Sequence, residues 1–161
     1  MEAERLKMVY NANANYTVLH CVASQLDLVK KYPMIKSDFG EKKHLWWIYQ
    51  AIEYLAEQGY GVASQIELED ALKRYIPDPK AAELKNKRGY NVLEEFRYRA
   101  DSCKLDRNLD GAYREVLKYR ALRELAKVGV DISDFWDDYE VDVDKIEEMC
   151  DRLNKSSPEY K

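Results

Sequence analysis

Apolar side chains recur every three or four residues along most of the chain, which is the spacing of one face of an α-helix. We expect a first helix that stops before Pro33, because proline cannot continue a helix. A second helix is expected from an N-cap at Ser37 or Asp38 to a stop at Gly59. The apolar positions are Val18, Leu19, Val22, Leu26 and Val29 in the first helix, and Leu45, Ile48, Tyr49, Ile52, Leu55 and Ala56 in the second.

Three further helices are expected in the middle of the chain. Ser64 and Glu67 have the spacing of a capping box, and the helix that they open ends before Pro77. A short basic helix is expected over residues 80–88, and Asn91 can cap a fifth helix.

Two more helices are expected on either side of an acidic connector, residues 131–144. The longer one begins at Asn108 or Asp110 and ends at Gly129. Its apolar stripe rotates along its length, so this helix should contact more than one neighbour. Its apolar positions are Leu109, Ala112, Tyr113, Val116, Leu117, Leu122, Leu125 and Ala126, and those of the last helix are Ile146, Met149, Cys150 and Leu153.

The whole pattern predicts an all-α fold. No stretch alternates between apolar and polar residues for long enough to indicate a strand, and no internal repeat is present. We predict a compact orthogonal helical globule over residues 1–106, a helical hairpin over residues 107–155, and a linker or tail over residues 156–161.

Composition narrows the class of protein. The chain has 161 residues, enough for one domain or one domain with an appendage, and 46% of them are hydrophobic, which is enough for a core. Its apolar stretches are too short for a membrane span, and residues 1–10 lack the apolar core of a signal peptide. We therefore expect a cytoplasmic protein. The net charge of −4 argues against binding nucleic acid chiefly through phosphates.

Catalytic and metal-binding motifs are absent from the sequence. It has no phosphate-binding GxxxxGK[ST], no GxGxxG, no GxSxG and no HExxH. His20 and His44 have no evident partners, the acidic connector lacks the glycine and glutamate of an EF-hand, and the three cysteines are far apart. We predict no catalytic residue, no cofactor and no metal.

Aromatic side chains indicate possible contacts with another protein. Trp47 and Tyr54 define a second face on a helix whose core stripe is already complete, and Phe135 and Trp136 lie in the acidic connector. One interpretation is that neighbouring helices cover the face that Trp47 and Tyr54 define. The other is that this face contacts a partner protein, since Trp and Tyr are frequent at binding hot spots. Phe135 and Trp136 could likewise anchor the hairpin or a partner.

Several short motifs also follow one another in a recognisable order. Small and aliphatic residues precede an Asp-Phe pair, then a histidine opens a helix closed by a leucine and a glycine, and a tyrosine-led helix with a Leu-Arg pair precedes a turn. The residues are Ala14 to Ala23, Asp38-Phe39, His44, Ile48, Ala51-Ile52, Leu55, Gly59, Tyr113, Val116, Leu122-Arg123, Leu125, Gly129-Val130-Asp131-Ile132 and Phe135. This order, over roughly residues 13–153, resembles the N-terminal domain of DnaB-type replicative DNA helicases, especially diverged phage and Gram-positive members.

The resemblance implies a role without catalysis. In such helicases this domain pairs subunits in a collar above the ring of ATPase domains, and it receives the C-terminal domain of primase and, in some systems, a helicase loader. It would contact DNA only indirectly. The implied interface comprises Tyr113, Val116, Leu117, Leu122, Arg123, Leu125, Phe135, Trp136, Ile146, Met149 and Leu153, with Trp47 and Tyr54 as further surface aromatics.

A second hypothesis belongs to another class of function. The capped helix over residues 65–75, the turn at 77–79 and the basic residues Lys80, Lys85, Lys87 and Arg88 could form a helix-turn-helix-like unit. The chain would then be a stand-alone phage or plasmid protein that binds DNA. Its acidic pI of about 5.4 weighs against that role.

Overall fold

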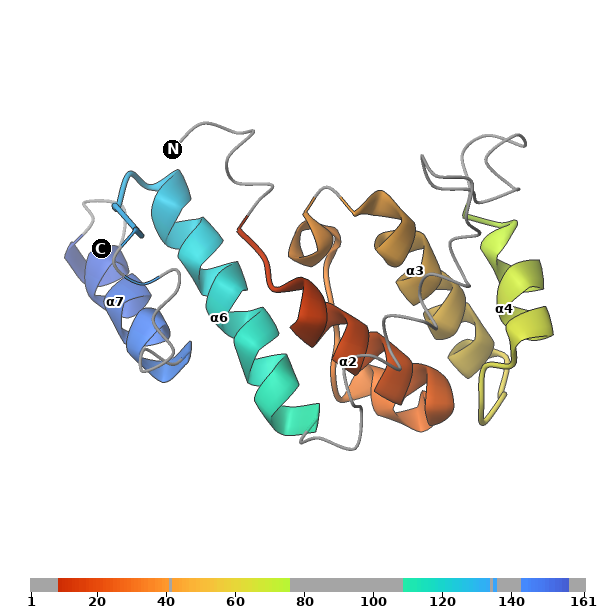
Figure 1. The fold of residues 1–161 in the computed structure, drawn as a ribbon. Helices are drawn as coiled ribbons and strands as arrows, with labels where there is room; N and C mark the ends of the chain where they lie inside the picture. The colour runs from red at the N-terminus through yellow and green to blue at the C-terminus, as the bar shows by residue number, and fades with distance from the viewer. Residues whose placement is uncertain (1–8, 41, 76–108, 134, 136–142, 157–161) are drawn as a thin grey trace.

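The fold is all-helical throughout the described residues, which confirms the predicted class (Figure 1). The structure is a computed structural model, and it describes residues 9–40, 42–75, 109–133, 135 and 143–156. The helices expected over residues 80–88 and after Asn91 lie outside these ranges. The α-helices are α2 (Ala12–Ser24), α3 (Lys43–Glu57), α4 (Gln65–Leu72), α6 (Leu109–Lys127) and α7 (Val143–Ser156), and the 3-10 helices are η1 (Leu26–Lys30) and η2 (Lys36–Phe39).

The first predicted helix is broken at Gln25, so the expectation of one helix up to Pro33 is wrong in this detail. The cause is the loop that follows α3. Ala63 N–H donates to the carbonyl of Ala23 at 2.8 Å, and Leu26 N–H donates to the carbonyl of Gly61 at 2.9 Å. The Ala23 carbonyl and the Leu26 N–H therefore bond to this loop instead of forming the i→i−4 hydrogen bonds of a continuous helix.

Two predicted helix ends and one predicted helix start are confirmed, and another predicted start is wrong. Gly59 has a φ of 89° and Gly129 a φ of 90°, as expected for glycines that terminate α3 and α6. The Ser64 hydroxyl accepts from the Glu67 N–H at 3.3 Å and so caps α4. Asp38, by contrast, does not cap α3. It accepts from Ile35 N–H at the start of η2, and α3 begins at Lys43.

Two hydrophobic cores lie on opposite sides of α6. The helices form a row in the order α7, α6, α2, α3, α4, and contacts join each neighbouring pair (Figure 1). The first core lies among α2, η1, η2, α3 and α4 and includes Val116 from α6. The second core lies between α6 and α7 and includes Leu122, Leu125 and Ile146, with Val9 from the N-terminal segment. This sharing of α6 matches the rotation of its apolar stripe.

The last two helices pack against each other as expected, but they run in the same direction. Arg114 near the start of α6 pairs with Asp144 at the start of α7 at 2.8 Å, and Ala121 lies beside Cys150 further along. The pair therefore differs from a hairpin, whose helices are antiparallel. Ile132, five residues after the end of α6, is buried in the second core.

Candidate functional site

A buried carboxylate, that of Asp38, ties η2 to α6. The Asp38 side chain has no exposed surface, and it accepts from two arginines of α6. Its Oδ1 accepts from Arg123 Nη2 at 2.6 Å and from Arg120 Nε at 3.1 Å. Its Oδ2 accepts from Arg120 Nη2 at 2.5 Å and from the Ile35 N–H at 2.9 Å. These four bonds fill the hydrogen-bonding capacity of the carboxylate.

This Asp38 cluster, formed by Asp38, Arg120 and Arg123, also reaches the N-terminal segment and α2. Arg123 Nη1 donates to the carbonyl of Val9 at 2.9 Å, and the side-chain amide of Asn15 donates to the carbonyl of Asp38 at 3.0 Å. Burial lowers the pKa of the Arg123 guanidinium from its ordinary value, and the Asp38 carboxylate opposes that shift. The cluster therefore fixes the orientation of α6 relative to the first core.

Tyrosines attach the first half of α6 to the same segment. The Tyr113 hydroxyl donates to the carbonyl of Pro33 at 2.6 Å, and its ring packs edge-on against Tyr32 at 5.2 Å between centroids. The Tyr32 hydroxyl in turn donates to the Asp110 carboxylate. Together with the Asp38 cluster, these contacts hold α6 at both halves of its length.

Most of the residues predicted to form an interface are already covered inside this chain. Val116, Leu122, Leu125 and Ile146 are each at most 2% exposed, and Arg123 is 4% exposed. Tyr113, Phe135 and Met149 pack partly buried against the two cores. Trp136 and the side chain of Leu153 lie outside the described residues. In the described part of the predicted set, Leu117 and Leu125 line an open groove, and Leu125 is only 1% exposed.

Trp47 and Tyr54 on α3 are both half-buried against the first core. Tyr54 also has the Arg74 guanidinium 4.2 Å from its ring centroid, in a cation–π contact. Contacts inside the chain therefore cover much of the face that Trp47 and Tyr54 define, in line with the interpretation that neighbouring helices cover it.

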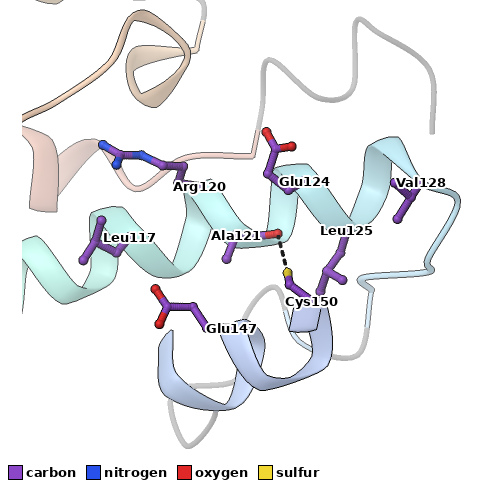
Figure 2. A pocket seen from close by; sticks show the side chains of 8 residues that line it. All are labelled: Leu117, Arg120, Ala121, Glu124, Leu125, Val128, Glu147 and Cys150. Carbon is purple, nitrogen blue, oxygen red and sulfur yellow. Dashed lines mark hydrogen bonds between the residues drawn. The ribbon is translucent and has the colours of Figure 1, made fainter. Parts of the chain in front are cut away.

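A groove of about 360 Å³ opens between α6 and α7 (Figure 2). We call it the α6–α7 groove. Leu117, Ala121 and Leu125 follow one another along α6, and Val128 lies in the turn after it. Cys150 on α7 lies against Ala121, with its Sγ 4.0 Å from the Ala121 carbonyl oxygen. The remaining lining residues are the charged Arg120, Glu124 and Glu147.

The electrostatics of the groove are acidic. Burial raises the pKa of the Cys150 thiol, and the carboxylates of Asp151, Glu124 and Glu147 raise it further. Arg120 is the one cation among the residues that line the groove, and its guanidinium is directed to Asp38, which it shares with Arg123. A thiol with a raised pKa is a poor nucleophile at neutral pH, so Cys150 does not suit a catalytic role.

Sequence reasoning missed the Asp38 cluster as a site, although Asp38 and Arg123 both lie in the motifs quoted above. Arg120 and Arg123 are three residues apart, which places them on one face of a helix. That spacing is a local signal for a shared anion. The sequence does not show which of the chain's 30 acidic residues supplies it.

Other kinds of site find no counterpart in the part of the chain that the structure describes. No three His, Cys, Asp or Glu side chains there are grouped as ligands for a metal ion. Every helix there is too short or too polar to span a bilayer. The exposed face of α4 carries Glu69 and Asp70, which suits a solvated surface better than a helix that contacts phosphates.

Comparison with known proteins gives one informative relative. No family model matches the chain, and no solved structure is similar to it. The chain is 27% identical over 127 residues to the SPbeta prophage-derived uncharacterized protein YorI of Bacillus subtilis (strain 168). The match covers 79% of this chain and 24% of that protein, so the chain spans about a quarter of its relative's length. The chain is thus similar to a prophage-derived protein.

Proposed function

We propose that this chain is a non-catalytic assembly domain of a phage-type replicative DNA helicase, which pairs subunits and receives primase or a helicase loader. The observation that carries the proposal is the α6–α7 pair, held to the globule by the Asp38 cluster while one side of it stays open as a groove. A rigid helix pair of this kind suits a platform for another protein, because little conformational entropy is lost when it binds.

Two further observations support this function. The order of motifs between residues 13 and 153 resembles the N-terminal domain of DnaB-type helicases. The relative from the SPbeta prophage is about four times as long as the segment that matches it, so there the matching segment is a domain-sized part of a larger protein. The proposal assigns motor activity to such a larger protein and not to this chain.

The exposed fraction of each side chain indicates which of the predicted interface residues a partner can contact. Val116, Leu122, Leu125 and Ile146 keep their place in the two cores and act as support. Leu117 on α6 and Val128, in the turn after α6, are apolar side chains of the groove that a partner can reach, and Val128 is 70% exposed.

Light scattering coupled to size exclusion tests the proposal on the 161-residue chain. We expect self-association at high concentration, or a complex with the C-terminal domain of the primase from the same phage. Leu117→Asp should weaken the complex with the primase domain at least tenfold, whereas Ile66→Asp should not, because Ile66 is 80% exposed on α4, far from the groove.

Three results would contradict the proposal. A strict monomer that also ignores the primase domain removes both expected contacts. Salt-dependent, submicromolar binding to duplex DNA would favour the DNA-binding accessory protein instead. ATP hydrolysis by the chain would rule out a non-catalytic domain.

A further inference from the structure

We infer that the α6–α7 groove receives an amphipathic helix of a partner protein that carries Lys or Arg beside its apolar stripe. The inference deepens the proposed function, and it rests on that function for the existence of a partner. It adds the chemistry by which the partner is recognised, which neither the motif order nor the prophage relative indicates.

The shape of the groove suits a helix. Its floor is apolar, made by Leu117, Ala121 and Leu125 of α6 with Cys150 of α7, and Val128 stands exposed at one end. From Leu117 to the end of α6 at Lys127 the groove follows the helix for about 15 Å at 1.5 Å per residue, which is about three helical turns. A partner helix of that length would present its i, i+3, i+4 and i+7 side chains to this floor.

The charge of the groove specifies the polar side of that helix. Glu124 forms an ion pair with Lys127 at 3.2 Å, and both side chains are more than half exposed. Glu147 has no ion-pair partner among the described residues. Arg120 forms its ion pair with Asp38 and not with either of these two carboxylates. Lysines or arginines along the edge of a docked helix would complement these carboxylates.

A second copy of this chain fits the groove less well. The exposed residues of α7 include Asp144, Glu147, Glu148 and Asp151 against Lys145 and Arg152. Two such faces brought together would place like charges opposite one another, which is unfavourable. The carboxylates of Glu124 and Glu147 and the acidic face of α7 both favour a basic partner over self-association at this groove.

A pair of synthetic peptides tests the inference on the full chain. The probe is a 14-residue, amidated helix of leucine and lysine in helical spacing, and its counterpart has glutamate in place of every lysine. We expect saturable binding of the lysine peptide, and at least tenfold weaker binding of the glutamate peptide, by fluorescence anisotropy at physiological salt.

Cysteine alkylation locates the bound peptide. Cys150 lines the groove, whereas Cys21 lies on α2, and burial raises the pKa of both thiols. With iodoacetamide and mass-spectrometric mapping, the lysine peptide should slow alkylation at Cys150 and leave Cys21 unchanged. Cys21 therefore serves as the internal reference.

Matched charge reversals complete the test. Glu124→Lys with Glu147→Lys should weaken binding of the lysine peptide about tenfold, while Glu69→Lys with Asp70→Lys on α4 makes the same change in net charge and should alter it less than twofold. Far-UV circular dichroism checks that both variants are folded.

The inference is overturned if both peptides bind equally, if the two double variants lose affinity equally, or if Cys150 is not protected. Protection of Cys150 by raising the concentration of the chain alone would make the groove a self-interface and would also overturn it. If the groove variant fails to bind the lysine peptide yet still binds the primase domain, the proposed function stands and its interface lies elsewhere.

Discussion

Replacing Asp38 by alanine should be among the most damaging single substitutions in the chain. The carboxylate has no exposed surface, and Arg123, one of its two partners, has a side chain only 5% exposed. Asp38→Ala leaves that guanidinium buried without an anion, and it removes the acceptor of the Ile35 N–H as well. Removing one partner of a buried ion pair lowers the free energy of unfolding by about 3–5 kcal/mol.

That loss is large beside the total stability of a domain, which is about 5–15 kcal/mol. For a chain of this size it corresponds to a fall in Tm of roughly 6–20 °C. Urea unfolding followed by far-UV circular dichroism measures the change in the free energy of unfolding. The matched control is Arg114→Met, which breaks the Arg114–Asp144 pair, 49% and 70% exposed, and should cost less than about 1 kcal/mol.

A combined variant separates the buried charge from the loss of packing. Asp38→Leu with Arg120→Met and Arg123→Met replaces the whole cluster by apolar side chains of similar volume, which is often close to neutral for buried ion pairs. It should be more stable than Asp38→Ala. The reasoning is refuted if Asp38→Ala costs no more than Arg114→Met, or if the combined variant is no more stable than Asp38→Ala.

Further predictions concern single positions. Leu122→Ala should cost about 2–5 kcal/mol in urea unfolding because Leu122 is fully buried, whereas Ile66→Ala, at an 80% exposed position, should stay within about 0.5 kcal/mol. Gly129→Ala should cost about 1 kcal/mol from its φ of 90° alone, because open space surrounds the added Cβ, and equal stability would contradict this. Burial, and then the Glu57 carboxylate, raises the pKa of Glu53 above its ordinary 4.5. The folded state then binds this proton more tightly, so stability falls as the pH rises through the folded pKa, and Glu53→Gln should raise the Tm at pH 7 but not at pH 3.5.

Features set by neighbouring residues could be predicted from the sequence. The stops at Gly59 and Gly129 need only a glycine after an apolar stripe, and the start at Ser64 needs only a hydroxyl three residues before an available N–H. The helical class and the sharing of α6 followed in the same way from the spacing of apolar side chains.

Features set by distant residues could not be predicted. The break at Gln25 depends on hydrogen bonds from a loop near Gly61, and the stripe of apolar residues continues across it without any sign of interruption. The direction of α7 shows in the contacts of Asp144 with Arg114 and of Cys150 with Ala121, and the apolar stripe of α7 could face α6 in either direction. The burial of Arg123 depends on Asp38, 85 positions away in the chain.

The parallel direction of α6 and α7 has an electrostatic consequence for the groove. Continuing the register that sets Cys150 beside Ala121 brings Ser156 level with Lys127, so the carboxyl ends of both helices lie at the same end of the pair. Each helix end carries about half a negative charge from its aligned peptide dipoles, and in a parallel pair these contributions add instead of cancelling. The Val128 end of the groove therefore attracts cations through the backbone itself, and this attraction would persist in a variant without Glu124 and Glu147.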